Sequence, residues 1–203
     1  MNGVARLNWR VLAGIACMIM PAPASAADWP VNEQTKTYAI SGSTGPELYF
    51  SIGERGPRVG SGRAIAHTTF DLKWSRDYRP QPDGSCLLAA ARPFITIIYT
   101  IPKPSGQLPA ATRRLWDVFI DGIRRHEKVH GDQIREMVER IHATTVGLSV
   151  PNDPGCREIR KAIQAPLAAA SQEQRRRSAE YDREEMRDGG AVHSLILNLV
   201  NGG

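Results

Sequence analysis

Cysteine is scarce in this sequence, and long apolar segments are missing beyond the N-terminus. The 203 residues include three cysteines, and no two of them have the short spacing of cysteine-based zinc sites. No segment beyond residue 26 approaches the roughly 20 apolar residues of a membrane-spanning helix. The sequence also has no internal repeat and no long low-complexity segment. These absences argue against a cysteine zinc finger, a repeat protein and a membrane span in the mature chain.

Positive charge is in mild excess, which gives little reason to expect a nucleic-acid partner. The formal net charge is +5, and two of the positive residues, Arg6 and Arg10, lie in the N-terminal segment. The one basic run, residues 175–177, falls in a highly charged segment with a helical pattern. Such a run is usually a solvated helix face, and no RNA- or DNA-binding motif accompanies it. We therefore expect no nucleic acid among the partners.

Residues 1–26 have the features of a cleavable secretory signal peptide. Arg6 and Arg10 form a positive region, residues 11–20 form a short apolar region, and residues 24–26 read Ala-Ser-Ala. This order of charge, apolar core and small residues is typical of a signal peptide cut after Ala26. The prediction is a mature protein of residues 27–203 that is periplasmic or secreted.

Two cysteines remain in the mature chain, Cys86 and Cys156. In an oxidising compartment we expect them to form one disulfide, which would tie the early part of the chain to the late part. The alternative is a pair of buried free thiols.

The remaining pattern predicts a single α+β domain. Residues 28–104 are β-rich, with strands expected at 36–40, 47–52, 68–74 and 94–101, a loop at 53–63 and turns at 76–85. We expect a small, mostly antiparallel sheet. From residue 110 the apolar spacing becomes helical, and two long helices are predicted at 110–146 and 157–187, the second kinked near Pro166. Residues 192–200 form an apolar tail of strand or helix.

The first of these helices contains the pattern H-E-x-x-H, formed by His126, Glu127 and His130. Positions i and i+4 of a helix lie on one face, so both imidazoles can point at one metal ion. A glutamate beside them is placed to accept a proton from water activated by zinc. Both histidines also lie at the apolar stripe, where unpartnered imidazoles would be costly. We predict a catalytic Zn²⁺ site.

A catalytic zinc needs a third protein ligand, which the sequence does not supply beside the motif. A helical hairpin would bring the second long helix back beside the first, together with the acidic cluster at 181–185. Our order of candidates is Asp182, Glu185, Asp188 and then His193. One of the first two would bind zinc while the other orients a histidine. The alternative is that these acids are simply solvated.

The predicted chemistry is hydrolysis of a carbonyl compound. Glu127 would accept a proton from the attacking water and pass it to the leaving amine. A nearby donor would stabilise the oxyanion, and Tyr181 and, less favoured, His67 are the candidates.

Several motifs together resemble a bacterial family of predicted secreted zinc-dependent proteases, domain of unknown function 922. They are residues 37–38, 40–42 and 53–57, the strand ending in Trp74, Cys86, the β-rich run ending in Pro102, Trp116 before residues 126–131, residues 152–156 and residues 188–190. The resemblance covers nearly the whole mature chain and implies a zincin-like domain in the periplasm or outside the cell. The chain departs from that family at Met186, where similar chains often have a histidine.

Two functions are compatible with these features. The first is an exported zinc metallopeptidase that acts on a peptide, a protein or a cell-wall peptide. The alternative is a catalytically inactive zincin-like envelope protein that binds a peptide, a protein or peptidoglycan. Glu127 favours the first, because a scaffold has no need of a general base.

Overall fold

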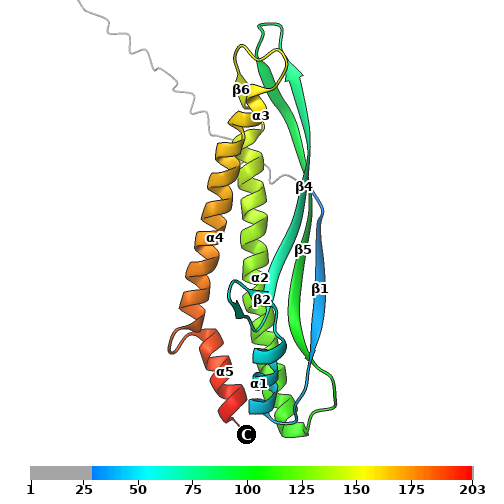
Figure 1. The fold of residues 1–203 in the computed structure, drawn as a ribbon, viewed down its shortest axis with the longest axis vertical. Coiled ribbons are helices and arrows are strands. Elements are labelled where there is room, and N and C mark those ends of the chain that lie inside the picture. The colour runs from blue at the N-terminus through cyan, green and yellow to red at the C-terminus, as the bar shows by residue number, and fades with distance from the viewer. Residues whose placement is uncertain (1–28, 203) are drawn as a thin grey trace, which may run out of the picture.

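A long central helix lies between a sheet and a second long helix (Figure 1). The computed structural model describes residues 29–202, so the predicted signal peptide lies outside the described residues. The central helix is α2 (Ala110–Thr145), and the second is α4 (Gln164–Met186). The main strands are β1 (Val31–Ile40), β4 (His67–Pro80) and β5 (Cys86–Pro104). The α+β class and the two long helices predicted from the sequence are confirmed.

The sheet is mixed, which corrects the expectation of a mostly antiparallel one. Its order is β1-β5-β4, and the short strand β6 (Ser149–Val150) also pairs with β5. β4 and β6 run antiparallel to β5, whereas all of β1 pairs with β5 in parallel, from Val31↔Ile95 to Ile40↔Pro104. β4 lies between β1 and β5 in the chain and runs the opposite way, so β5 returns in the direction of β1.

Residues 47–52 form part of a helix and not the strand that was predicted. Helix α1 (Gly45–Arg55) begins at Thr44, whose hydroxyl accepts from the Glu47 backbone N–H. The Glu47 side chain in turn accepts from the Thr44 backbone N–H, which completes a capping box. Leu48, Ser51 and Ile52 form the buried face at helical spacing. The capping box and Pro46 at the first turn override the β preference of Tyr49 and Phe50.

The neighbouring turn and loop predictions are also corrected. β4 continues through residues 76–80, so only 81–85 form a turn, with Gly84 at φ +82°. The long register with β5 supplies ladder hydrogen bonds that outweigh the turn preference of these residues. The predicted loop at 53–63 holds the end of α1 and a small hairpin of β2 (Arg58–Val59) and β3 (Gly62–Arg63).

Two apolar clusters flank the middle of α2. The first joins α2 to α1, β1 and the C-terminal helix α5 (Ala191–Asn201), and includes Phe119 and Ile123. The second joins α2 to β5 and α4, and includes Ile134 and Val138. The segment between Ile123 and Ile134 is therefore held rigidly at both ends, and it contains the H-E-x-x-H pattern.

A third apolar cluster surrounds the disulfide between Cys86 and Cys156, which confirms that prediction. It contains Ile159 of the short helix α3 (Glu158–Ala162) and Ile163. The predicted kink near Pro166 is a break at Ile163 between α3 and α4, close to where proline removes a helical hydrogen bond. Among residues 29–202, no helix combines the length and apolar character needed to cross a bilayer.

Candidate metal centre

His126 and His130 lie one turn apart on α2 and turn their Nε2 atoms toward each other. These two atoms are 3.1 Å apart, and the side chains are 10% and 12% exposed. The helix sets this spacing, because residues four apart lie on the same face. At this distance either one nitrogen carries a proton that it donates to the other, or both lone pairs point at one shared cation.

Asp182 of α4 supplies the third atom of the cluster. Its Oδ1 lies 3.2 Å from Nε2 of His126 and 2.9 Å from Nε2 of His130. The three residues form a group that could hold a metal ion. α4 is held against α2 here by polar contacts: the Ser178 hydroxyl donates to Gln133 Oε1 at 2.7 Å. The helical hairpin thus brings Asp182 to the histidines.

The donor set fits zinc. Two imidazole nitrogens and one carboxylate, with further positions open, form the ligand set of a catalytic site. Tetrahedral zinc with ligands at ~2.0–2.2 Å would hold neighbouring ligand atoms about 3.3–3.5 Å apart. The observed separations of 2.9 to 3.2 Å are slightly shorter, so small outward movements of the side chains would meet that geometry.

The electrostatics of the cluster also favour a cation. Burial alone would raise the pKa of the Asp182 carboxyl, but hydrogen bonds with His126 and His130 outweigh it and hold that pKa well below its usual range. Burial would lower the pKa of His130, and the hydrogen bond to Asp182 together with its charge raises it instead. The carboxylate is therefore ionised and ready to bind a positive charge at neutral pH.

Glu185 and Tyr181 lie against the outer side of His126. Glu185 Oε2 is 3.8 Å from His126 Nδ1, a buried atom without a hydrogen-bond partner among the described residues. If Nε2 held a metal, Nδ1 would carry the proton, and Glu185 would be placed to orient the ring. Tyr181 stacks on His126 at 4.8 Å between ring centroids. It packs on the histidine and is absent from the lining of the cleft described below.

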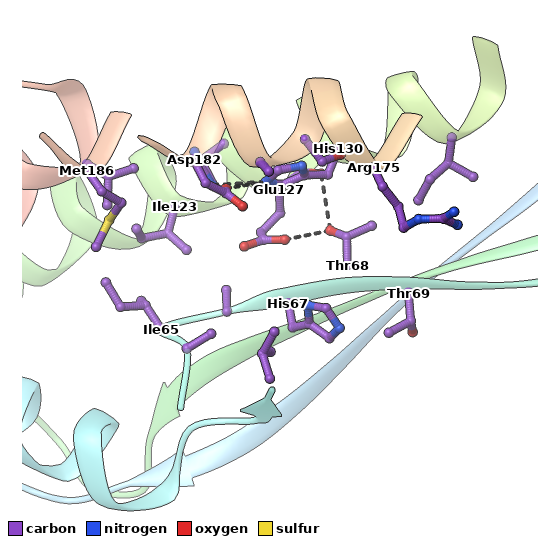
Figure 2. Close-up of a pocket in the computed structure, with 18 of the residues that line it drawn as sticks. Ile65, His67, Thr68, Thr69, Ile123, Glu127, His130, Arg175, Asp182 and Met186 are labelled. Carbon is purple, nitrogen blue, oxygen red and sulfur yellow. Dashed lines mark hydrogen bonds and ion pairs between the residues drawn. The ribbon is translucent and has the colours of Figure 1, made fainter. Parts of the chain in front are cut away.

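Glu127 is buried, with 5% of its surface exposed, and a residue of the sheet holds its carboxylate. The Thr68 hydroxyl of β4 donates to Glu127 Oε2 at 2.6 Å (Figure 2). Sequence reasoning missed Thr68. The only signal was its place in an alternating strand, on the face shared with Leu72 and Trp74, where a hydroxyl needs a partner.

A cleft of about 910 Å³ opens between the start of β4 on one side and α2 and α4 on the other (Figure 2). His126, Glu127, His130 and Asp182 all line it. The carboxylate and the candidate ligands therefore face the same space, whose volume lies in the range of ligand-binding clefts.

Comparison with known proteins gives one match. Residues 35–190 match the family described as "Bacterial protein of unknown function (DUF922)". The chain belongs to the DUF922 family. No curated protein and no solved structure matches it. Because the function of DUF922 is unknown, membership assigns no activity, and the protease and zincin assignments stay predictions.

The other predicted site residues of this DUF922 chain are placed apart from the cluster. His67 lines the opposite wall of the cleft, on β4. His193 Nδ1 accepts from the Gly189 backbone N–H, and its Nε2 is 3.9 Å from Asp188. Asp188 and His193 thus pair with each other and are not in the group that could hold a metal. Of the four candidate third ligands, Asp182 is the one brought to both imidazoles.

Proposed function

We propose that this protein is an exported zinc-dependent hydrolase that cleaves peptide or amide bonds. The observation that carries the proposal is a buried carboxylate, Glu127, beside three convergent ligand atoms at the wall of one cleft. A structural metal site has no use for an unliganded acid in that position. The disulfide supports an oxidising compartment, as expected for an exported protein.

His126, His130 and Asp182 would hold the zinc, which supplies Lewis acidity for the carbonyl and for the attacking water. Glu127 accepts a proton from that water as its oxygen attacks the carbonyl carbon. The C–N bond then breaks, and Glu127 returns the proton to the leaving amine. Thr68 keeps the Glu127 carboxylate in one orientation throughout, because its hydroxyl donates to Oε2 at 2.6 Å. Glu185 would orient His126 through Nδ1.

Metal analysis and two variants of the mature protein test this function. The purified protein is expected to bind about one zinc per chain, and His126→Ala is expected to lose it. Glu127→Gln should keep the zinc and lose hydrolysis of unstructured peptides by on the order of a hundredfold or more. His142→Ala is the matched control, since His142 is on the same helix but packs on Trp29.

Two results would reject parts of the proposal. Zinc content unchanged in His126→Ala would remove the metal site. Zinc binding with no hydrolysis of any peptide or cell-wall peptide, in a protein that still binds these ligands, would favour the inactive envelope-binding domain instead.

A further inference from the structure

Three consecutive arginines on α4 have different surroundings. Arg176 pairs with Glu173 at 2.7 Å and Glu180 at 2.6 Å, and Arg177 pairs with Glu136 of α2. Arg175 lines the cleft and makes no ion pair within residues 29–202. The prediction of a solvated face therefore fits the exposed Arg175 and Arg176, and Arg175 adds to the lining of the cleft a positive charge that no described carboxylate pairs with.

The two ends of the cleft differ in character. Along α4, Met186 lies four residues beyond Asp182, about 6 Å along the helix axis, and Arg175 lies seven residues before it, about 10 Å. Figure 2 shows Met186 and Arg175 on opposite sides of Asp182. The candidate metal site therefore lies between two ends of the cleft. Met186 lies at one end and Arg175 at the other.

The end marked by Met186 is apolar. Ile65 of the segment before β4, Ile123 of α2 and Val192 of α5 line the cleft together with Met186. Met186 is 48% exposed although it faces these apolar neighbours. An apolar side chain of a ligand would cover it and remove that surface from water.

The charges of the cleft favour an acidic ligand. The charged residues in its lining are Arg63, Arg175, Glu127 and Asp182. Both acids belong to the metal site, where a divalent cation would balance them. The two arginines then leave the cleft with a positive potential, and the Arg63 guanidinium already donates to the Gly56 carbonyl at 2.6 Å. Arg175 is the free partner for a carboxylate.

We propose that the cleft selects peptides with an apolar side chain on one side of the susceptible bond and a carboxylate two to three residues away on the other. An extended chain advances about 3.3 Å per residue, so the ~10 Å between Asp182 and Arg175 corresponds to that offset. The position of the bond relative to these groups rests on the proposed function. The preference for an acidic peptide depends on the charges of the zinc-loaded cleft and not on hydrolysis.

Binding to the zinc-loaded Glu127→Gln protein tests the preference without hydrolysis. The probes are fluorescently labelled peptides that differ at one position. The outer position, expected to face Arg175, carries Asp, Asn or Lys, and the inner position, expected to face Met186, carries Leu. Fluorescence anisotropy measures their binding. We expect the Asp peptide to bind about tenfold tighter than the Asn peptide, and this ratio to fall as salt is raised. Adding Arg175→Glu to this protein should reverse the order of affinities, so that the Lys peptide binds most tightly.

Arg183→Glu is the matched control, because Arg183 is exposed on the same helix and outside the cleft lining. It makes the same charge change and should keep the preference for Asp. Met186→Ser should reduce the difference in affinity between peptides with Leu and with Ala at the inner position. Circular dichroism and zinc content would show that each variant folds.

The outcomes separate this inference from the function on which it rests. Equal binding of the Asp and Asn peptides, or an unchanged order in Arg175→Glu, overturns the inference even if the wild type cleaves peptides. A preference for Asp that Arg175→Glu reverses supports it, including when the wild type cleaves none of them. Absence of cleavage together with this preference for Asp would reject only the hydrolase proposal.

Discussion

At the scale of single residues, the position of one carboxylate decides what the site can do. Glu127 is next to His126 in the chain, yet its side chain turns toward β4 and receives the Thr68 hydroxyl. A buried carboxylate with one strong donor has a defined orientation, which a general base requires. In the proposed mechanism Thr68 is a positioning residue, and it lies 59 residues earlier in the chain than Glu127.

Thr68→Val, which keeps the shape and removes the hydroxyl, is expected to lower the hydrolytic rate while zinc content is unchanged. Hydrogen bonds to charged groups contribute about 1.5–3 kcal/mol, which corresponds to a rate loss of roughly ten- to a hundredfold. The measurement is kcat and KM with one peptide, because loss of the donor should lower kcat and leave KM nearly unchanged. Thr69→Val is the neighbouring control. Equal rates in Thr68→Val and wild type would contradict the positioning role.

At the scale of elements, β1 fixes α2 from the side opposite to the cleft. Glu33 of β1 accepts from Lys128 Nζ at 2.8 Å, from Arg135 and from the Tyr99 hydroxyl. Gly131 allows this approach, since a Cβ there would lie 2.1 Å from the Tyr99 oxygen. Lys128, a variable position of the H-E-x-x-H pattern, therefore anchors the helix to the sheet while its neighbours face the cleft.

The contribution of Glu33 to stability should change with pH between about 4.5 and 2. Burial alone would raise its pKa, but hydrogen bonds from Lys128, Arg135 and Tyr99 outweigh that effect and lower the pKa from 4.5 to about 2. A carboxyl with a lowered folded-state pKa stabilises the fold above its unfolded pKa, and this contribution is lost as pH falls from about 4.5 toward 2.

Glu33→Gln is therefore expected to lower the free energy of unfolding at pH 7 by about 1–2 kcal/mol, less than the full pKa shift implies because solvent screens the group. The difference from wild type should shrink as the pH falls toward 2. Urea unfolding at several pH values measures it. Glu54→Gln, at an exposed position of α1, is the control. A difference that stays constant with pH would contradict the linkage.

At the scale of the whole molecule, the disulfide joins the two ends of a long excursion of the chain. Cys86 begins β5 and Cys156 precedes α3, at a sequence separation of 70. The closed loop contains β5 and all of α2, and the link lies in its own apolar cluster with Ile159 and Ile163. The bond therefore stabilises the position of the helical hairpin relative to the sheet.

Removal of this disulfide should lower stability without removing the candidate metal ligands. The double variant Cys86→Ala with Cys156→Ala is expected to lose about 2–4 kcal/mol of unfolding free energy. Denaturant unfolding with and without a reductant measures this. The reductant should lower the unfolding free energy of the wild type to that of the double variant and leave the value of the variant unchanged. A fully reduced wild type that keeps the unfolding free energy of the oxidised protein would contradict the prediction.

The sequence by itself determined the features that depend on spacing within one element. The helix at 110–145 follows from its apolar period, and the shared face of His126 and His130 follows from 3.6 residues per turn. The disulfide followed from two cysteines and the expected compartment. The capping box of Thr44 and Glu47 is also a sequence signal, and it identifies the start of α1 where the β propensity of Tyr49 and Phe50 predicts a strand.

Only the tertiary structure decided which distant residues meet. Asp182 and Glu185 are three residues apart and share a helix face, so sequence spacing cannot separate them as the third ligand. The orientation of α4 about its axis brings Asp182 to both imidazoles and places Arg175 in the lining of the cleft. Thr68 reached Glu127 for the same reason. Local periods are set by the backbone, whereas contacts between elements are set by packing across the whole domain.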